Sequence, residues 1–374
     1  MHFISSTTIA LGLCDAASAG VARSFTTPHG PRQAASSLDA AIKAKGKGYA
    51  GTALTIRDDS AEKAVITSEF NSITPENAMK WESTEPSRGN FTFDGADAVV
   101  DLASANGDEI RCHTLIWYSQ LPTWVSEGGF DNATLISIME MHINAVMGRY
   151  KGKCTYWDVV NEALNEDGTF RDNVFLTTIG EAYIPISFRL AAAADPEAKL
   201  YYNDYNLEYG ADTAKALGAA RIVKLVQSYG EKIDGVGLQG HMTSEATGTQ
   251  SVPTPSQDIL EGVLSLYTDL GVDVAYTELD VRFETPATPE KLVAQADAYA
   301  RLVGSCMNTV RCVGITLWGV SDKYSWIPGV FPAEGAALVW DENFQKKPAY
   351  QAVLDTINAA PATNSTALYR RGRV

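Results

Sequence analysis

Eight short runs rich in β-branched and aromatic residues recur along the chain, and this repeat limits the possible folds more than any other feature. Turns and longer stretches with apolar residues at helical spacing lie between them, for example at 135–150, 213–229 and 292–303. Strands that alternate with helices predict an α/β fold, a (β/α)₈ TIM barrel with catalytic groups at the carboxyl ends of its strands. The predicted strands are 49–55, 72–79, 110–117, 155–160, 200–205, 236–242, 274–281 and 314–320.

The 374 residues carry no long linker rich in Ser, Thr or Pro, so we expect a single catalytic domain over 36–358. Residues 20–35 are predicted to form an irregular leader and residues 359–374 a loosely ordered tail. A short apolar stretch at 8–13 is followed by Ala-Ser-Ala at 17–19, which has the form of a secretory cleavage site. We therefore expect a signal peptide over 1–19 and a secreted, extracellular protein.

The formal net charge of −15 disfavours nucleic acid and anionic membranes as partners, because both require clusters of Lys and Arg. No later segment reaches the 18 or so uninterrupted apolar residues of a membrane span. An uncharged substrate fits this charge balance better.

The cysteines fit an oxidising compartment rather than a metal site. Cys14 would leave with the signal peptide, and the other four form an even set without the pair spacing of zinc ligands. Cys306 and Cys312 can close a short loop worth roughly 2 kcal/mol in the chain-entropy model. Pairing of Cys112 with Cys154 is geometrically possible and is left open, since both belong to adjacent predicted strands. Glycosylation sequons begin at Asn90, Asn132 and Asn364.

Two glutamates, Glu162 and Glu278, each end a β-branched and aromatic run, as strand ends that face a shared site should. Two such carboxylates suggest glycoside hydrolysis, because one can protonate the leaving oxygen while the other attacks the anomeric carbon. A lone glutamate at a strand end would more often be a helix cap or an ion-pair partner.

Motifs at six strand ends closely resemble glycoside hydrolase family 10, which comprises mainly endo-β-1,4-xylanases. The resemblance runs from about Leu38 to Ile357, with the motifs in the expected order. The segments NDYN (203–206) and KYSWIPG (323–329) are similar to the fungal branch. The six motifs are TPENAMKW (74–81), HTLIW with QLP (113–122), WDVVNEA (157–163), QGH (239–241), TELD (277–280) and WGV to Trp326 (318–326).

The resemblance implies an endo-1,4-β-xylanase that retains anomeric configuration, with Glu162 as general acid/base and Glu278 as nucleophile. It further implies that His241 and Asp280 form a hydrogen-bonded chain that holds the nucleophile ionised. A lone histidine is more often structural, and only its position in the QGH motif favours this role. We expect no cofactor and no metal, xylan and xylo-oligosaccharides as partners, and a monomer.

The implied substrate-binding set surrounds the two glutamates. Asn161 resembles the amide that binds the sugar 2-hydroxyl, which requires a bulge or strand end because adjacent strand residues face opposite sides. A surface ion pair between Lys80 and Glu76 is the alternative for those two charges. Trp318 and Trp326 are candidate stacking platforms and a wall around C5 of xylose. The complete set is Glu76, Asn77, Lys80, His113, Trp117, Gln120, Asn161, Tyr205, Gln239, Trp318 and Trp326.

Three other functions stay open at this point. A retaining β-glycanase acting on cellulose or mannan would share the same pair of glutamates. A metal-dependent barrel hydrolase could use His113 and His241, although a His-x-His pair is missing. A sugar-binding protein without activity could use the same scaffold, because fold does not fix function.

Overall fold

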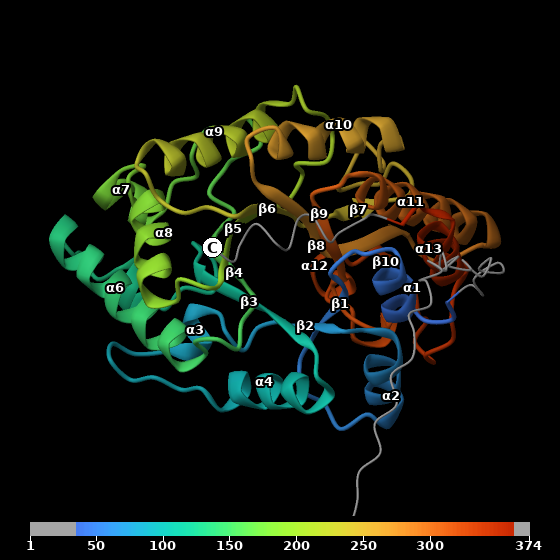
Figure 1. Cartoon of the computed structure of the whole chain (residues 1–374), viewed down its shortest axis with the longest axis horizontal. Coiled ribbons are helices and arrows are strands. Elements are labelled where there is room, and N and C mark those ends of the chain that lie inside the picture. Colours follow the sequence, from blue (N-terminus) through green and yellow to red (C-terminus); the bar gives the residue numbers. More distant parts are fainter. Residues whose placement is uncertain (1–34, 363–374) are drawn as a thin grey trace, which may run out of the picture. The chain divides into compact units, whose positions relative to one another are not determined.

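The computed structural model describes residues 35–362, which form a closed barrel of eight parallel strands (Figure 1). Neighbouring strands follow the chain order, and pairing of β8 with β9 and of β9 with β1 closes the ring. The predicted (β/α)₈ fold is therefore confirmed. The barrel strands are β1 (Tyr49–Leu54), β2 (Ser72–Pro75), β3 (Glu109–Ile116), β4 (Tyr156–Asn161), β5 (Lys199–Asp204), β6 (Gly235–Leu238), β8 (Asp273–Glu284) and β9 (Cys312–Leu317).

Three predicted strands were wrong in their extent. The run at 236–242 is divided into β6 and a separate strand, β7 (His241–Thr243), which pairs with β8. The division falls at Gly240, whose φ of +74° leaves the extended region and ends the β6 ladder. The predicted run at 72–79 likewise ends early, at Pro75, and β8 continues past its predicted end to Glu284, where β10 (Glu334–Gly335) pairs with it.

Helices surround the barrel, and their first residues follow ordinary capping chemistry. Asp131, Thr213 and Thr288 each accept a hydrogen bond from a backbone N–H in the first turn of the following helix. The helices are α1 (Leu38–Ala44), α2 (Ser60–Glu69), α3 (Trp81–Thr84), α4 (Asp94–Asn106), α5 (Thr123–Ser126), α6 (Asn132–Arg149), α7 (Val174–Ile179), α8 (Tyr183–Ala194), α9 (Ala214–Ser228), α10 (Gln257–Thr268), α11 (Pro289–Asn308), α12 (Ile327–Val330) and α13 (Pro348–Ala359), with a 3₁₀ turn at Asp322–Tyr324.

The barrel strands are buried on both faces, which explains their nearly continuous apolar runs. Towards their amino ends, Tyr49, Tyr156 and Tyr201 pack together inside the barrel. The guanidinium of Arg111 lies over the rings of Tyr156 and Tyr201 and pairs with Asp158. A charged pair therefore occupies the barrel interior, below the carboxyl ends of the strands.

Two disulfides join Cys306 to Cys312 and Cys112 to Cys154. The second one decides the pairing that the sequence left open, and it joins β3 to the segment before β4. Within residues 35–362, no helix combines the length and apolar character that a membrane span requires. The expected signal peptide, nearly all of the expected leader and most of the expected tail lie outside the described residues.

Candidate active site

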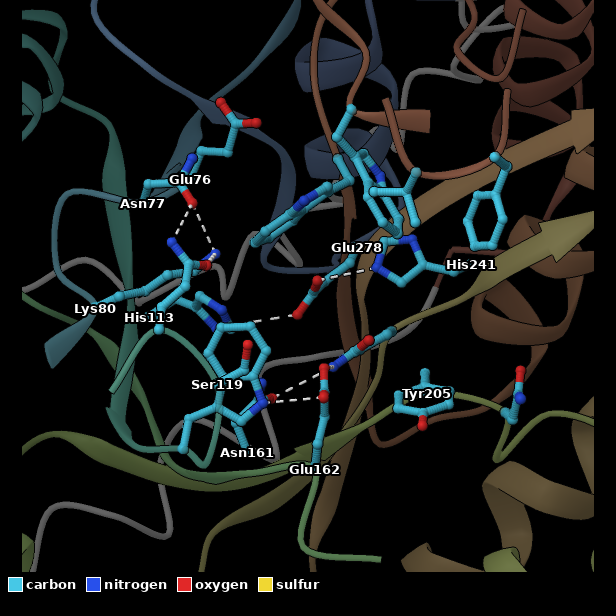
Figure 2. Close-up of a pocket in the computed structure, with 18 of the residues that line it drawn as sticks. Glu76, Asn77, Lys80, His113, Ser119, Asn161, Glu162, Tyr205, His241 and Glu278 are labelled. Carbon is cyan, nitrogen blue, oxygen red and sulfur yellow. Dashed lines mark hydrogen bonds and ion pairs between the residues drawn. The ribbon is translucent and has the colours of Figure 1, made fainter. Parts of the chain in front are cut away.

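A cleft of about 680 Å³ opens at the carboxyl ends of the barrel strands, and Glu162 and Glu278 both line it. Figure 2 shows Glu76, Asn77 and Lys80 on one side of these two carboxylates and Tyr205 on the other. Every residue of the predicted substrate-binding set lines the same cleft, and so does His241. Asp280 does not line it, because it lies behind His241. The structure thus brings residues from the six motifs and from the NDYN segment together in one site.

Glu278 is almost fully buried near the middle of β8, and both of its carboxylate oxygens accept hydrogen bonds. Asn203 donates to Oε1 over 2.8 Å, and His241 Nε2 lies 3.1 Å from Oε2. Burial raises the pKa of Glu278, but the hydrogen bond from His241 and the nearby His113 and His241 charges outweigh it, and the net pKa lies below the usual value. Glu278 is therefore held as a carboxylate.

His241 connects Glu278 to Asp280, as the family resemblance implied. Its Nδ1 lies 2.9 Å from Asp280 Oδ2, which also accepts a hydrogen bond from the Trp326 indole. Burial lowers the pKa of His241, but the carboxylates of Asp280 and Glu278 raise it to about 10. The imidazole is thus doubly protonated at neutral pH, and both ring nitrogens act as donors.

Glu162 follows β4 directly, with a backbone conformation that turns its side chain into the cleft. Its φ of +55° lies in the left-handed region, which non-glycine residues rarely adopt. The register between β4 and β5 shifts between Asp158 and Val160, which is a bulge in the strand just before it. Gln239 donates to Oε1 and the Trp117 indole donates to Oε2, each over 2.9 Å.

Asn161 is the last residue of β4, and the left-handed backbone of Glu162 directly after it allows both side chains to line the cleft, which is the strand end that the sequence argument allowed. Asn161 Oδ1 accepts hydrogen bonds from Asn203 at 2.9 Å and from Gln239 at 3.3 Å. These two bonds orient the amide so that its nitrogen is the group left to donate towards the cleft.

The hydrogen-bond partners of Lys80 are uncharged side chains. Lys80 does not pair with Glu76, so the alternative of an ion pair between these residues is wrong. Its ammonium donates to Asn77 at 2.8 Å and to Gln120 at 2.7 Å, and it lies 5.0 Å from the centre of the Trp117 ring. Burial lowers the pKa of Lys80, although nearby carboxylates oppose this shift.

The carboxylate of Glu76 has other partners. It accepts a hydrogen bond from Thr55 at 2.7 Å and lies 3.4 Å from Arg57. Glu76 and Lys80 thus reach the cleft from separate networks, and Lys80 keeps a cation beside the two central carboxylates.

His113 contacts the buried pair of Asp158 and Arg111 in the barrel interior. Its Nδ1 lies 3.0 Å from Asp158 Oδ2, and Asp158 pairs with Arg111. The ring of His113 also meets the Trp318 ring edge to face, with centroids 5.3 Å apart. The sequence argument identified His113 but missed Asp158 and Arg111, whose strand positions look like ordinary core positions.

Aromatic side chains form two parts of the cleft. Trp318 and Trp326 lie beside His241, with ring centroids 6.2 Å and 5.0 Å from it. Tyr205 lies across the cleft, where Arg171 donates to its hydroxyl over 2.7 Å and the Lys215 ammonium lies 3.3 Å from its ring centre. These contacts fix the Tyr205 ring with one face already covered by Lys215.

Several lining residues were not predicted. Tyr118, Ser119 and Asn206 adjoin predicted residues in the quoted motifs, so their neighbours gave a usable signal. Val330 ends α12, directly after the quoted segment 323–329, and Phe331 follows it. Arg282 comes from the extended part of β8, and Thr249 and Gln250 come from a loop without a recognisable pattern.

Within the described part of the chain, no group of three or more His, Cys, Asp and Glu side chains has an arrangement suited to a metal ion. The acidic and imidazole groups of the cleft instead bind one another and the surrounding amides.

Comparison with known proteins assigns this arrangement to a family. The family model for glycosyl hydrolase family 10 matches residues 37–356. Endo-1,4-beta-xylanase 2 of Aureobasidium pullulans is 66% identical over 363 residues, 96% of this chain and 99% of the relative.

Solved structures agree with this match. Endo-1,4-beta-xylanase XylE of Penicillium canescens has a TM-score of 0.83 and 36% identity, covering 88% of this chain and 99% of that one. Xylanase 10B of Thermotoga petrophila, solved in complex with xylobiose, has a TM-score of 0.81 and 34% identity, covering 87% and 98%. This chain belongs to glycosyl hydrolase family 10.

Proposed function

We propose that this protein is a secreted endo-1,4-β-xylanase that cleaves internal β-1,4 bonds of xylan and retains the anomeric configuration. Glu162 acts as general acid/base and Glu278 as nucleophile. The observation that carries the proposal is that the two carboxylates in one cleft have different hydrogen-bond donors. Glu278 is held ionised by His241, whereas Glu162 receives only neutral donors from Gln239 and Trp117.

In the first step, a Glu278 oxygen attacks the anomeric carbon while Glu162 gives its proton to the glycosidic oxygen. The bond between this carbon and the oxygen breaks, the shortened chain leaves as an alcohol, and a glycosyl ester remains on Glu278. The ionised state of Glu278 supports this role, because a protonated carboxyl group is a poor nucleophile.

In the second step, Glu162 is a carboxylate and removes a proton from water. The resulting hydroxide equivalent attacks the anomeric carbon, the ester bond breaks, and Glu278 returns as a carboxylate. Two displacements at one carbon restore the starting configuration. Asn161 supports both steps by donating its free amide N–H to the sugar 2-hydroxyl, an interaction that strengthens in the transition state.

The side chains on the two sides of the carboxylates support internal cleavage of a chain. Glu76, Asn77 and Lys80 offer polar partners to sugar hydroxyls on one side. Tyr205 offers an aromatic ring to sugars on the other side, and Phe331 also lines the cleft. The named activities of the relatives support xylan as the polymer.

Trp318 and Trp326 support xylose over glucose at the cleavage site. Both indoles line the cleft next to His241, where they can close the space that an exocyclic hydroxymethyl group needs. Xylose lacks this group, so the wall excludes larger sugars without cost to xylose.

Hydrolysis of linear xylan, carboxymethyl cellulose and mannan at equal concentration tests the substrate. We expect short xylo-oligosaccharides from xylan and far lower release of sugar from the other polymers. Proton NMR should show the β-anomer as the first product of xylohexaose. Preferred hydrolysis of cellulose or mannan, or early α-anomer, would contradict the proposal.

We also propose that residues 1–19 are a cleaved signal peptide, that 36–358 are the catalytic domain, and that the mature protein is a monomer. The two disulfides support an oxidising compartment. Amino-terminal sequencing of protein from the culture medium should begin at Gly20. Light scattering should give the mass of one chain.

A further inference from the structure

Glu208 is a buried carboxylate outside the cleft that no step of the proposed mechanism uses. It follows β5 and is 0% exposed. Its Oε1 accepts a hydrogen bond from the backbone N–H of Gly240 over 2.7 Å. Its Oε2 is buried without a hydrogen-bond partner among residues 35–362. Burial raises the pKa of Glu208 to about 7, because the ionised form is costly in this environment. The hydrogen bond from the Gly240 N–H is therefore the contact whose role is to be explained.

Gly240 lies between two of the residues that contact the catalytic pair. Gln239, just before it, donates to Glu162 Oε1 over 2.9 Å. His241, just after it, contacts Glu278 Oε2 at 3.1 Å. Consequently, the orientation of one short backbone segment sets the donors of both carboxylates at once.

The other side of this segment is fixed by β8. Glu278 N–H donates to the Gln239 carbonyl at 2.9 Å, and Asp280 N–H donates to the Gly240 carbonyl at 3.3 Å. A side chain at Gly240 would place its Cβ 2.5 Å from Leu279 Cδ2 in addition to the strain of a φ of +74°. The segment therefore has little space and a single conformation, in which the Gly240 N–H needs a buried acceptor.

We propose that Glu208 is a positioning residue for both catalytic glutamates, acting through the Gly240 N–H to hold Gln239 against Glu162 and His241 against Glu278. This role rests on the function proposed above. It differs from the role of His241, which touches Glu278 itself, because Glu208 touches neither glutamate. Its loss should therefore lower the rate of both chemical steps while the sugar-binding side chains other than Gln239 stay in place.

The test compares Glu208→Leu, which removes the acceptor at similar size, with Glu208→Gln, which keeps an acceptor for Gly240. For xylohexaose and for an activated aryl xylobioside, Glu208→Leu should lower kcat about tenfold or more, with KM changed less than about twofold. Glu208→Gln should keep kcat within about threefold of the wild type. If Glu208→Gln keeps its activity while Glu208→Leu loses it, the hydrogen-bond acceptor matters and a negative charge at this position does not.

Glu69 provides a matched control, because it is another buried glutamate that accepts a backbone N–H, from Leu38 at 3.1 Å, and it lies outside the cleft. Glu69→Leu should lower the melting temperature and leave kcat per folded molecule unchanged. If Glu208→Leu does the same, Glu208 is only structural and the proposal fails.

A fallback variant covers a failure of Glu208→Leu to fold. Glu208→Asp withdraws the acceptor by one methylene and should lower kcat to an intermediate value. Wild-type kcat in Glu208→Asp, or equal losses in Glu208→Gln and Glu208→Leu, would overturn the role. Inactive Glu162→Ala and Glu278→Ala variants alongside an unaffected Glu208→Leu would reject this inference and leave the proposed function intact.

Discussion

The amide nitrogen of Asn203 lies 2.8 Å from Oε1 of Glu278 and donates a hydrogen bond to it. The same nitrogen lies 2.9 Å from Asn161 Oδ1, so one group on β5 links the proposed nucleophile on β8 to the proposed 2-hydroxyl donor on β4. The side-chain oxygen of Asn203, Oδ1, accepts a hydrogen bond from the Thr277 hydroxyl at 2.6 Å, which fixes the orientation of the amide. Asn203 therefore aligns the two groups that we propose act on adjacent carbons of one sugar.

Replacing Asn203 by alanine should lower kcat roughly ten- to a hundredfold, because a hydrogen bond to a charged group is worth about 1.5–3 kcal/mol. Michaelis–Menten kinetics on xylohexaose measures this change. Asn71→Ala is the matched control, since Asn71 is also a buried asparagine but accepts from the Ala50 N–H outside the cleft. Equal kcat in the two variants would remove Asn203 from the reaction.

The two glutamates should fail in different ways when each is changed to alanine. Glu278→Ala should abolish turnover of every substrate, because no covalent intermediate can form. Glu162→Ala should spare the first step for aryl xylobiosides whose leaving groups need no proton. Burst kinetics on a dinitrophenyl xylobioside measures the difference.

Added azide provides the second measurement for this pair. Azide needs no general base, so it should partly restore turnover in Glu162→Ala and give a β-xylobiosyl azide, identified by mass spectrometry and NMR. The Glu278→Ala variant should not give this product. Equal behaviour of the two variants would reverse or remove the assigned roles.

The sequence predicted the barrel well, because each central strand is buried on both faces and so carries a compact apolar run. It also singled out Glu162 and Glu278 as glutamates that end β-rich runs, although β8 continues past Glu278 to Glu284. His241 was singled out by the resemblance of the QGH motif. The break at Gly240 was missed, because the run at 236–242 as a whole has the length of one strand and a single glycine does not by itself mark a break.

The polar contacts beneath the site could not be predicted for another reason. Arg111, Asp158, Asn203 and Glu208 are polar residues within or beside apolar runs, and the sequence does not reveal which buried group faces which. Their pairing depends on strand register. The bulge between Asp158 and Val160 changes that register within a run that looks uninterrupted in the sequence.

The two disulfides should differ in their effect on stability. Cys112 and Cys154 are 42 residues apart, which the chain-entropy model values at about 4 kcal/mol. Cys306 and Cys312 are 6 residues apart, which corresponds to about 2 kcal/mol. Calorimetry of the two double alanine variants should show the larger drop in melting temperature for the first pair. The reverse order would contradict the entropic account.

Chelation should leave hydrolysis of xylan unchanged, because both proposed steps move protons and form bonds through carboxylates without a Lewis acid. Exhaustive dialysis against EDTA followed by a reducing-sugar assay measures this. Loss of activity that zinc, manganese or calcium restores would favour the metal-dependent hydrolase that His113 and His241 left open.

The pH profile should depend on His241 through the ionisation of Glu278. The hydrogen bond and charge of His241 keep the pKa of Glu278 below its ordinary value, so wild-type activity falls only when acid protonates this carboxylate. His241→Ala removes the stabilising group and leaves the burial that raises the pKa. The carboxylate should then accept its proton at higher pH.

We therefore expect the acidic limb of kcat/KM in His241→Ala to move to higher pH, with lower activity at every pH. His241 has a pKa of about 10, so its own titration does not produce that limb in the wild type. His142→Ala is the control, since this buried histidine pairs with Glu85 outside the cleft and should change stability without moving the acidic limb. An unmoved acidic limb in His241→Ala would show that another group keeps Glu278 ionised, and Asn203 with its direct bond to Oε1 would be the next to change.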